Sequence, residues 1–269
     1  MRMLVSHIKE SISLWKIVLL IFGFQFFLAS TVGLQMQQVL DASIGNSLSI
    51  EKLQTGFSHT VFQDFLNEHG GSFSTLYGQM RWMVLIYLVF AAFISAGTIY
   101  VLVDKDYQIS RFFHGGVKYF TRFILLDLIF SSVILLLVGA GIAMIGYLFG
   151  IAPYEFDDEL TFLRWTMLIA IILIILIMVF TLWKIKAKFS MISGETKLWA
   201  SIKIGIKEVW ASKWSLLLIS FFFLLVSLLF SIATYAAGDL PLLPMILVIN
   251  AILVLKIFWR IVFFKVVGD

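Results

Sequence analysis

An apolar run from Phe123 to Phe149 constrains the fold of this chain more than any other feature. It spans 27 residues and contains a single charged residue, Asp127. A helix of about 20 apolar residues already crosses the hydrocarbon core of a bilayer, so this run is long enough to cross with some tilt. The segment just before it, between positions 111 and 122, is basic. The run therefore predicts a membrane-spanning helix, and we expect an integral membrane protein.

Five further apolar runs of similar length predict an all-α, polytopic protein with six transmembrane helices. Hydrophobic residues make up 61% of the sequence and charged residues 13%, about half of the ~25% typical of soluble domains. We expect a single integral membrane domain over residues 1–269, with an outer helical loop at 35–81. The predicted spans are 14–34, 83–103, 123–149, 163–183, 214–237 and 242–264.

Lysine and arginine are concentrated in every second connection between the spans. Seventeen of the 20 Lys and Arg residues lie in segments 1–16, 104–122, 184–213 and 256–269. Cytoplasmic connections carry an excess of these residues, so both termini are expected in the cytoplasm. The acidic residues at 155–159 are expected on the other side. Topology thus accounts for the net charge of +4, and we do not expect nucleic-acid binding.

The outer loop 35–81 has apolar residues at helical spacing, which predicts a helical hairpin or elbow. Gly56 is expected to divide it, and Gly70-Gly71 is expected to end its second helix. Two interpretations stay open for this loop. It could be a lid over the mouth of the bundle, or a structural cap packed on it.

Basic stretches precede the odd-numbered spans and predict cytoplasmic amphipathic helices. Two of them, Gly116–Lys118 and Gly205–Lys207, share glycine, a branched apolar residue and lysine, and His7–Lys9 is a looser match. A true repeat would give three helical hairpins, each with an interfacial helix. A few matched positions can also arise by chance, and both a true repeat and a chance match therefore stay open.

In this pattern the chain resembles several bacterial six-span membrane families of unassigned function. They include the membrane domain associated with glycerophosphodiester phosphodiesterases. The resemblance covers most of the chain as a succession of spans and basic stretches. It implies the cytoplasmic (inner) membrane of a bacterium and a bundle without catalytic activity, and it carries no functional residue over to this sequence.

Four polar residues within the predicted spans are candidate functional residues: Asp127, Lys256, Gln25 and Asn250. A carboxylate in an apolar span is costly and is a functional hypothesis by default. Lys256 lies at a similar depth, so we predict an Asp127–Lys256 pair, either a proton or ion relay or a structural ion pair. The two amides are expected to hydrogen-bond across helices or to contact a substrate.

Residue type and spacing predict two further interaction surfaces. Small residues on the outer half of the third span are expected to let a second helix approach closely. These residues are Gly139, Ala143, Gly146 and Gly150. A basic connection after the fourth span, divided near Gly194, is expected to bind anionic lipid headgroups or to dock a soluble partner such as an ATPase. Its lysines are Lys184, Lys186, Lys188, Lys203, Lys207 and Lys213.

The sequence contains no recognisable catalytic, cofactor or metal motif. It lacks cysteine, which excludes disulfides, thiolate metal sites and cysteine nucleophiles. Glycine motifs for phosphate or dinucleotide binding and the GxSxG serine motif are also missing. The spacing of His59, Asp64, Glu68 and His69 does not place them on one helical face, and residues 155–159 lack the pattern of a calcium loop. We expect no enzyme activity, cofactor or metal.

The leading functional prediction is a non-enzymatic integral membrane subunit, a scaffold or accessory component that binds lipid and partner membrane proteins. One alternative is a transport protein, such as the permease subunit of an ATP-driven exporter, which would require a soluble ATPase. Another is a protein that handles lipid in a groove lined by some of the 27 Phe residues. The three prolines lie at span ends or in a turn, which counts against the broken helices typical of transporters.

Overall fold

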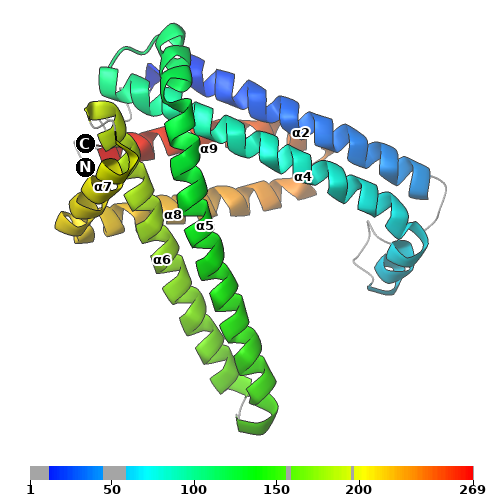
Figure 1. The fold of residues 1–269 in the computed structure, drawn as a ribbon. Coiled ribbons are helices and arrows are strands. Elements are labelled where there is room, and N and C mark those ends of the chain that lie inside the picture. The colour runs from blue at the N-terminus through cyan, green and yellow to red at the C-terminus, as the bar shows by residue number, and fades with distance from the viewer. Residues whose placement is uncertain (1–11, 45–58, 156–158, 195–196, 269) are drawn as a thin grey trace. The chain divides into compact units, whose positions relative to one another are not determined.

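A computed structural model of the chain describes residues 12–44, 59–155, 159–194 and 197–268 (Figure 1). The described residues are almost entirely helical, which confirms the predicted all-α class. The elements are α2 (Trp15–Ile44), α4 (His59–Asp104), α5 (Ile109–Glu155), α6 (Glu159–Ser193), α7 (Leu198–Ala211), α8 (Lys213–Ala236), the 3-10 turn η1 (Ala237–Asp239) and α9 (Leu242–Gly268).

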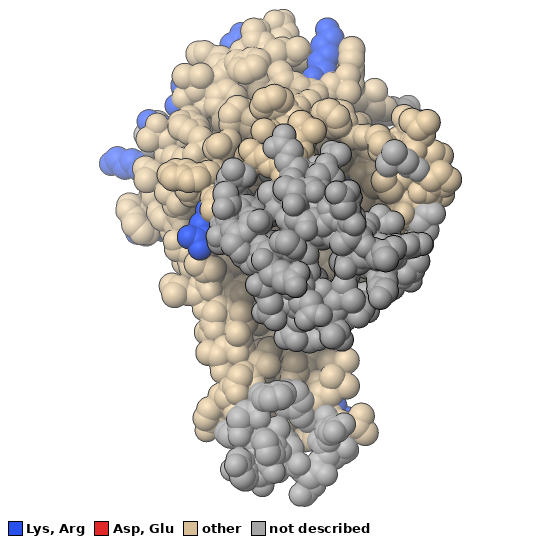
Figure 2. Space-filling model, turned by 90° about the vertical axis from the view of Figure 1, so that its right-hand side faces the viewer, with Lys and Arg blue, Asp and Glu red and all other residues tan. Residues whose placement is uncertain are grey.

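Six of the described helices are long and apolar enough to cross a membrane, and each overlaps one of the predicted spans. The chain therefore has the helices of a multi-pass membrane protein. On the face drawn in Figure 2, the described surface is almost wholly uncharged, with isolated Lys and Arg side chains and no acidic side chain in view. The candidate spans are Trp15–Gln35, Arg81–Asp104, Ile109–Tyr147, Leu163–Ser193, Trp214–Ala236 and Leu243–Gly268.

The outer loop differs from its prediction. α2 continues to Ile44 and α4 begins at His59, so both helices extend into the predicted loop 35–81. The expected helix end at Gly70-Gly71 is wrong, because α4 runs unbroken through both glycines. Glycine costs a helix interior only about 1 kcal/mol relative to alanine, which a helix of 46 residues can absorb. The expected break at Gly56 lies outside the described residues.

The chain divides into two compact units, which are described separately. One unit, Leu19–Ala91, holds most of α2 and the first part of α4. Within it, the rings of Phe24 and Phe90 stack with their centroids 3.6 Å apart. Many of its apolar side chains are exposed, including Trp82 at 70%. Exposed apolar surface of this kind marks contact with a membrane or with another protein.

The other unit contains the residues before Leu19 and after Ala91, and α6 makes contacts with four of its helices. α5 and α7 pack on α6, while α8 and α9 pack on each other and on α6. α5 and α6 lie side by side in Figure 1. Phe112, Phe123 and Leu182 are among its fully buried side chains.

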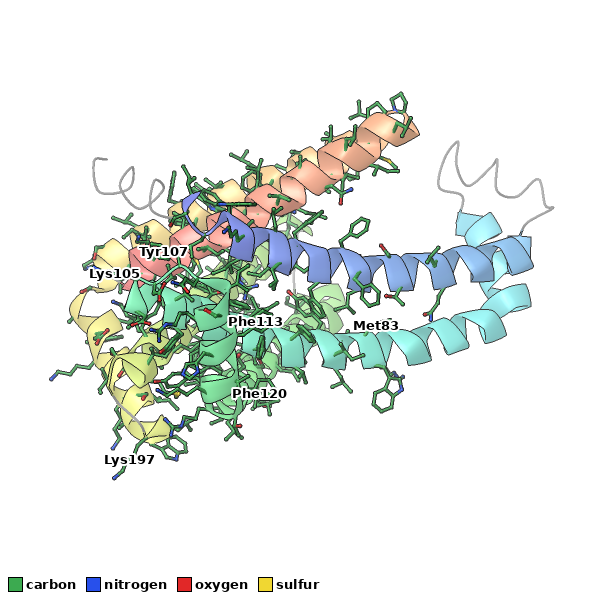
Figure 3. All side chains as sticks on the ribbon, turned by 90° about the horizontal axis from the view of Figure 1, so that it is seen from above. Met83, Lys105, Tyr107, Phe113, Phe120 and Lys197 are labelled. Carbon is green, nitrogen blue, oxygen red and sulfur yellow. The ribbon has the colours of Figure 1, made fainter. Side chains whose placement is uncertain are left out.

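A short connection turns the chain from α4 into α5. Lys105 has a left-handed φ of 55°, directly after the end of α4 at Asp104. The Arg111 guanidinium closes the turn, because it lies 3.1 Å from an Asp106 carboxylate oxygen and 3.8 Å from one of Asp104. Lys105 and Tyr107 mark this connection in Figure 3. The start of α5 is thereby held against the end of α4.

The two basic stretches that share glycine and lysine pack in a similar way, but only the second forms a helix of its own. The first belongs to α5, which is unbroken from Ile109, so the separate helix expected there does not form. The second forms the separate helix α7. A Cβ at Gly116 would lie 2.6 Å from the Phe93 ring, and one at Gly205 would lie 2.8 Å from the Ala187 nitrogen. Each glycine therefore lets its stretch lie against the preceding span. The looser N-terminal match lies outside the described residues.

Candidate functional site

A buried ion pair joins α4, α5 and α6. Lys188 Nζ donates hydrogen bonds to Asp127 Oδ2 at 2.8 Å and to Ser95 Oγ at 2.9 Å. Lys184 Nζ lies 3.5 Å from Asp127 Oδ1. The two lysines are four residues apart and therefore share one face of α6. We call Ser95, Asp127, Lys184 and Lys188 the Asp127 cluster.

The ammonium of Lys188 is enclosed by groups that stabilise its charge. Its side chain is 6% exposed, compared with 21% for Asp127. Its Nζ lies 5.0 Å from the centroid of the Phe123 ring, and the face of an aromatic ring attracts a cation. The Ser95 hydroxyl donates to the Ala92 carbonyl at 3.0 Å, which leaves its oxygen free to accept from Lys188. A buried charge needs such compensation, because its removal from water is costly.

The predicted partner of Asp127 is wrong. The cations beside Asp127 come from α6, whereas Lys256 lies on α9 in the wall of a cavity. Depth along a span could not identify the partner, because it does not show which helices are neighbours. The four-residue spacing of Lys184 and Lys188 was the available signal, because it places two cations on one face.

The three predicted lysines on α6 are all turned into the protein. Lys184 and Lys188 belong to the Asp127 cluster. Lys186 is 12% exposed, lies 3.6 Å from a Glu208 carboxylate oxygen on α7, and donates to the Gly268 carbonyl at 3.4 Å. These residues therefore hold α5, α7 and α9 on α6, and do not form the exposed basic face that was expected.

Helix α7 carries the exposed part of the predicted basic face. Lys203 and Lys207 are exposed there, close in sequence to Trp199 and Trp210, which are 67% and 65% exposed. Tryptophan and lysine together are typical of helices at a membrane–water interface. The side chain of Lys213 lies outside the described residues. The buried side of α7 consists of Ser201, Gly205 and Val209.

The small residues on the outer half of α5 are exposed in the described structure. Gly139, Ala143 and Gly146 are exposed, and a Cβ at either glycine would meet nothing within 4 Å. We call these three residues the α5 stripe. α5 instead approaches α6 through Gly141, whose missing side chain leaves room for Leu173. The α5 stripe is therefore unoccupied within the described chain.

The two mid-span amides do not join helices in the described structure. Asn250 Nδ2 donates to the Ile246 carbonyl of its own helix at 2.8 Å, so its predicted bond across helices is wrong. Gln25 is partly exposed in the Leu19–Ala91 unit, and no described hydrogen bond links it to another helix. A substrate contact for either amide stays a prediction.

A cavity of about 510 Å³ lies between α6, α8 and α9, and we call it the basic cavity. Lys256 and Arg260 both line it, and no Asp or Glu is among its lining residues. The Trp259 ring in its wall stacks on Phe223 with the centroids 4.3 Å apart. Sequence reasoning singled out Lys256 but missed Arg260. The four-residue spacing of the two cations on one helix was the signal that could have found it.

Several predicted candidates lie outside what the structure describes. The described residues contain no group of three or more His, Asp or Glu residues that could hold a metal ion. The side chains of several predicted candidates are not described, namely those of His59, Asp64, Glu68 and His69 and those at 155–159. The surroundings of Gly150 are likewise not described.

No protein-family model, curated protein or solved structure matches this chain. The resemblance to bacterial six-span membrane families therefore stays a prediction. Four features of the described structure bear on function: the Asp127 cluster, the α5 stripe, the exposed face of α7 and the basic cavity.

Proposed function

We propose that this chain is a non-enzymatic integral membrane subunit, a scaffold or accessory component that binds lipid and partner membrane proteins. The observation that carries the proposal is the unoccupied α5 stripe. Helices associate in lipid chiefly by close packing, and small residues let two backbones approach. The stripe is flanked by Leu135 and Leu136, each 73% exposed, and by Ile142 at 64%. A small-residue groove between large apolar side chains fits a second helix.

The Asp127 cluster supports an accessory role over a transport role. Its carboxylate and its buried ammonium are paired with each other, so the cluster fits a structural ion pair that fixes α5 on α6. The described spans are also continuous helices, whereas many transporters bind their substrates at broken ones. The ATPase-docking alternative is weakened, because the three lysines of α6 face inward.

Lipid binding is supported by the exposed face of α7. Its lysines would attract anionic headgroups at about 1 kcal/mol each, while its tryptophans would lie at the headgroup level. In this proposal α7 and both chain termini lie on the cytoplasmic side, in the cytoplasmic membrane of a bacterium. The distribution of Lys and Arg along the sequence supports that orientation.

Replacing both glycines of the α5 stripe by leucine tests the partner-binding role. Leucine fits at Gly139 and Gly146 within the chain, since nothing lies within 4 Å of either Cβ position, so the Gly139→Leu/Gly146→Leu variant should fold. Met144→Leu is the control, because Met144 is also exposed but lies away from the stripe. We expect the wild type and the control, purified in mild detergent, to retain the same membrane protein or a second copy of the chain, and the double variant to lose it.

Two results would count against this role. The wild type could purify without any other membrane protein and without self-association, or the double variant could retain every partner of the wild type. The cysteine-free sequence allows an independent check of self-association. A single cysteine at Ala143 should form a disulfide-linked dimer if the partner is a second copy.

Lipid handling is the second candidate, and the basic cavity favours it. Phe223 and Phe263 line this cavity together with two cations. That combination suits an amphiphile better than it suits a polar solute.

A further inference from the structure

The basic cavity combines a partly open volume with an excess of positive charge. Its volume of about 510 Å³ lies within the range of small-molecule sites, which is roughly 300–1,000 Å³. Lys256 and Arg260 reach it from α9, and apolar side chains of α6 and α8 form much of its wall. Neither cation forms an ion pair with a described carboxylate. The Arg260 guanidinium lies 5.4 Å from the Phe264 ring, and an aromatic face only partly offsets such a charge.

Two residues in the wall of the basic cavity also carry hydrogen-bond donors without acceptors, and both donors lie beneath the cavity surface. The Ser220 hydroxyl and Trp259 Nε1 are buried and have no hydrogen-bond partner in the described structure. Ser227 and Ser231 line the cavity too, but their hydroxyls already donate to the backbone carbonyls of Phe223 and Ser227.

The positions of the cations give the cavity a direction. Arg260 is nearer than Lys256 to the basic C-terminal end of α9. Ser231 lies in the C-terminal half of α8. The apolar residues Ile177 and Met178 of α6 line the same cavity within a candidate span. A ligand with an anionic head toward the basic end and an apolar body toward the membrane interior would match this gradient.

We infer that the basic cavity binds one anionic phospholipid, with its phosphate between Lys256 and Arg260. Arginine pairs with phosphate in a bidentate geometry, and lysine adds a second charge. The apolar wall favours a lipid over a free anion. The inference deepens the proposed lipid-binding role and rests on it.

The test uses the full chain, purified in an uncharged detergent. Micelles containing either phosphatidylcholine or phosphatidylglycerol are added, and the lipid retained per chain is counted by native mass spectrometry. We expect the wild type to retain one phosphatidylglycerol in preference to phosphatidylcholine. Lys256→Gln/Arg260→Gln should weaken that retention at least about tenfold, because two charge-assisted contacts are lost.

The matched control is Lys118→Gln/Arg122→Gln on α5. It removes the same two residue types at the same four-residue spacing, from positions that are exposed. It should retain lipid like the wild type. Ser227→Leu fills the cavity without changing its charge and should also lose the lipid. This variant decides the question if the double variant does not fold, as judged by circular dichroism and gel filtration.

Three results would overturn the inference. The control could lose lipid as strongly as the cavity variants, phosphatidylcholine could be retained as well as phosphatidylglycerol, or added inorganic phosphate could displace the lipid, which would identify a soluble anion as the ligand. Retention of the partner by the same preparations is measured separately. If lipid selectivity is absent but partner binding persists, this inference fails and the proposed scaffold role stands.

Discussion

Replacing Asp127 by asparagine should destabilise the unit built around α6. The change removes the carboxylate that lies 2.8 Å from the nearly buried Lys188 ammonium. Removing one partner of a buried ion pair costs ~3–5 kcal/mol, because the remaining charge is left unpaired. Asp127 is 21% exposed and asparagine keeps an acceptor oxygen, so we expect a loss of ~2–3 kcal/mol in the free energy of unfolding.

The opposite replacement, Lys188→Met, should cost less. Asp127 would keep the ammonium of Lys184 at 3.5 Å, and methionine can fill the space of the lysine stem. We expect a loss of ~1 kcal/mol, comparable to one net hydrogen bond. The double variant should be more stable than Asp127→Asn alone, since the nearly buried charge of Lys188 is then absent.

Equilibrium unfolding in mixed micelles, followed by tryptophan fluorescence, measures these differences. Asp106→Asn is the control, because its pair with Arg111 is exposed and should contribute only ~0.2–1 kcal/mol. The reasoning is refuted if Asp127→Asn is as stable as the wild type, or if the double variant shows the sum of the two single losses. A relay would give a different result, with normal stability and lost proton-coupled uptake.

Two further predictions concern packing and orientation. Gly205→Ala should lower the free energy of unfolding by ~1–3 kcal/mol in thermal unfolding, because the new Cβ would lie 2.8 and 2.9 Å from backbone atoms of α6. Gly33→Ala, with nothing within 4 Å, should leave stability unchanged or raise it, and equal losses in both variants would contradict this account. Single cysteines at Arg164 and Lys207 should react with a membrane-impermeant maleimide from opposite sides, and reaction from one side would overturn the orientation.

The spans were predictable because a single property decides them. A run of about 20 apolar residues has few alternatives to a helix that crosses the bilayer, whatever its neighbours are. The helix ends were less predictable. α5 begins at Ile109, well before the apolar run, because the basic segment there packs through Gly116 against Phe93. That contact depends on how two helices lie against each other, which hydropathy does not record.

The partner of Asp127 could not be predicted for a related reason. Lys184 and Lys188 lie in the basic C-terminal half of their span and Lys256 lies near the middle of its own, and the charge of each fits a pair with Asp127. The choice depends on which helices are neighbours and on how each is rotated. α5 lies along α6 partly because Gly141 gives room to Leu173, and that packing brings Asp127 to the face that carries two lysines.

The charges of the spans are the reason for proposing an anionic ligand in the basic cavity. Asp127 is the one acidic residue in the candidate spans of α5, α6, α8 and α9, and its carboxylate is already shared by Lys184 and Lys188. Lys256 and Arg260 therefore have no acidic residue within these spans to pair with. Cations at the edge of a low-dielectric region either reach water or bind an anion. An anionic headgroup in the cavity would supply the negative charge that these spans do not offer to Lys256 and Arg260.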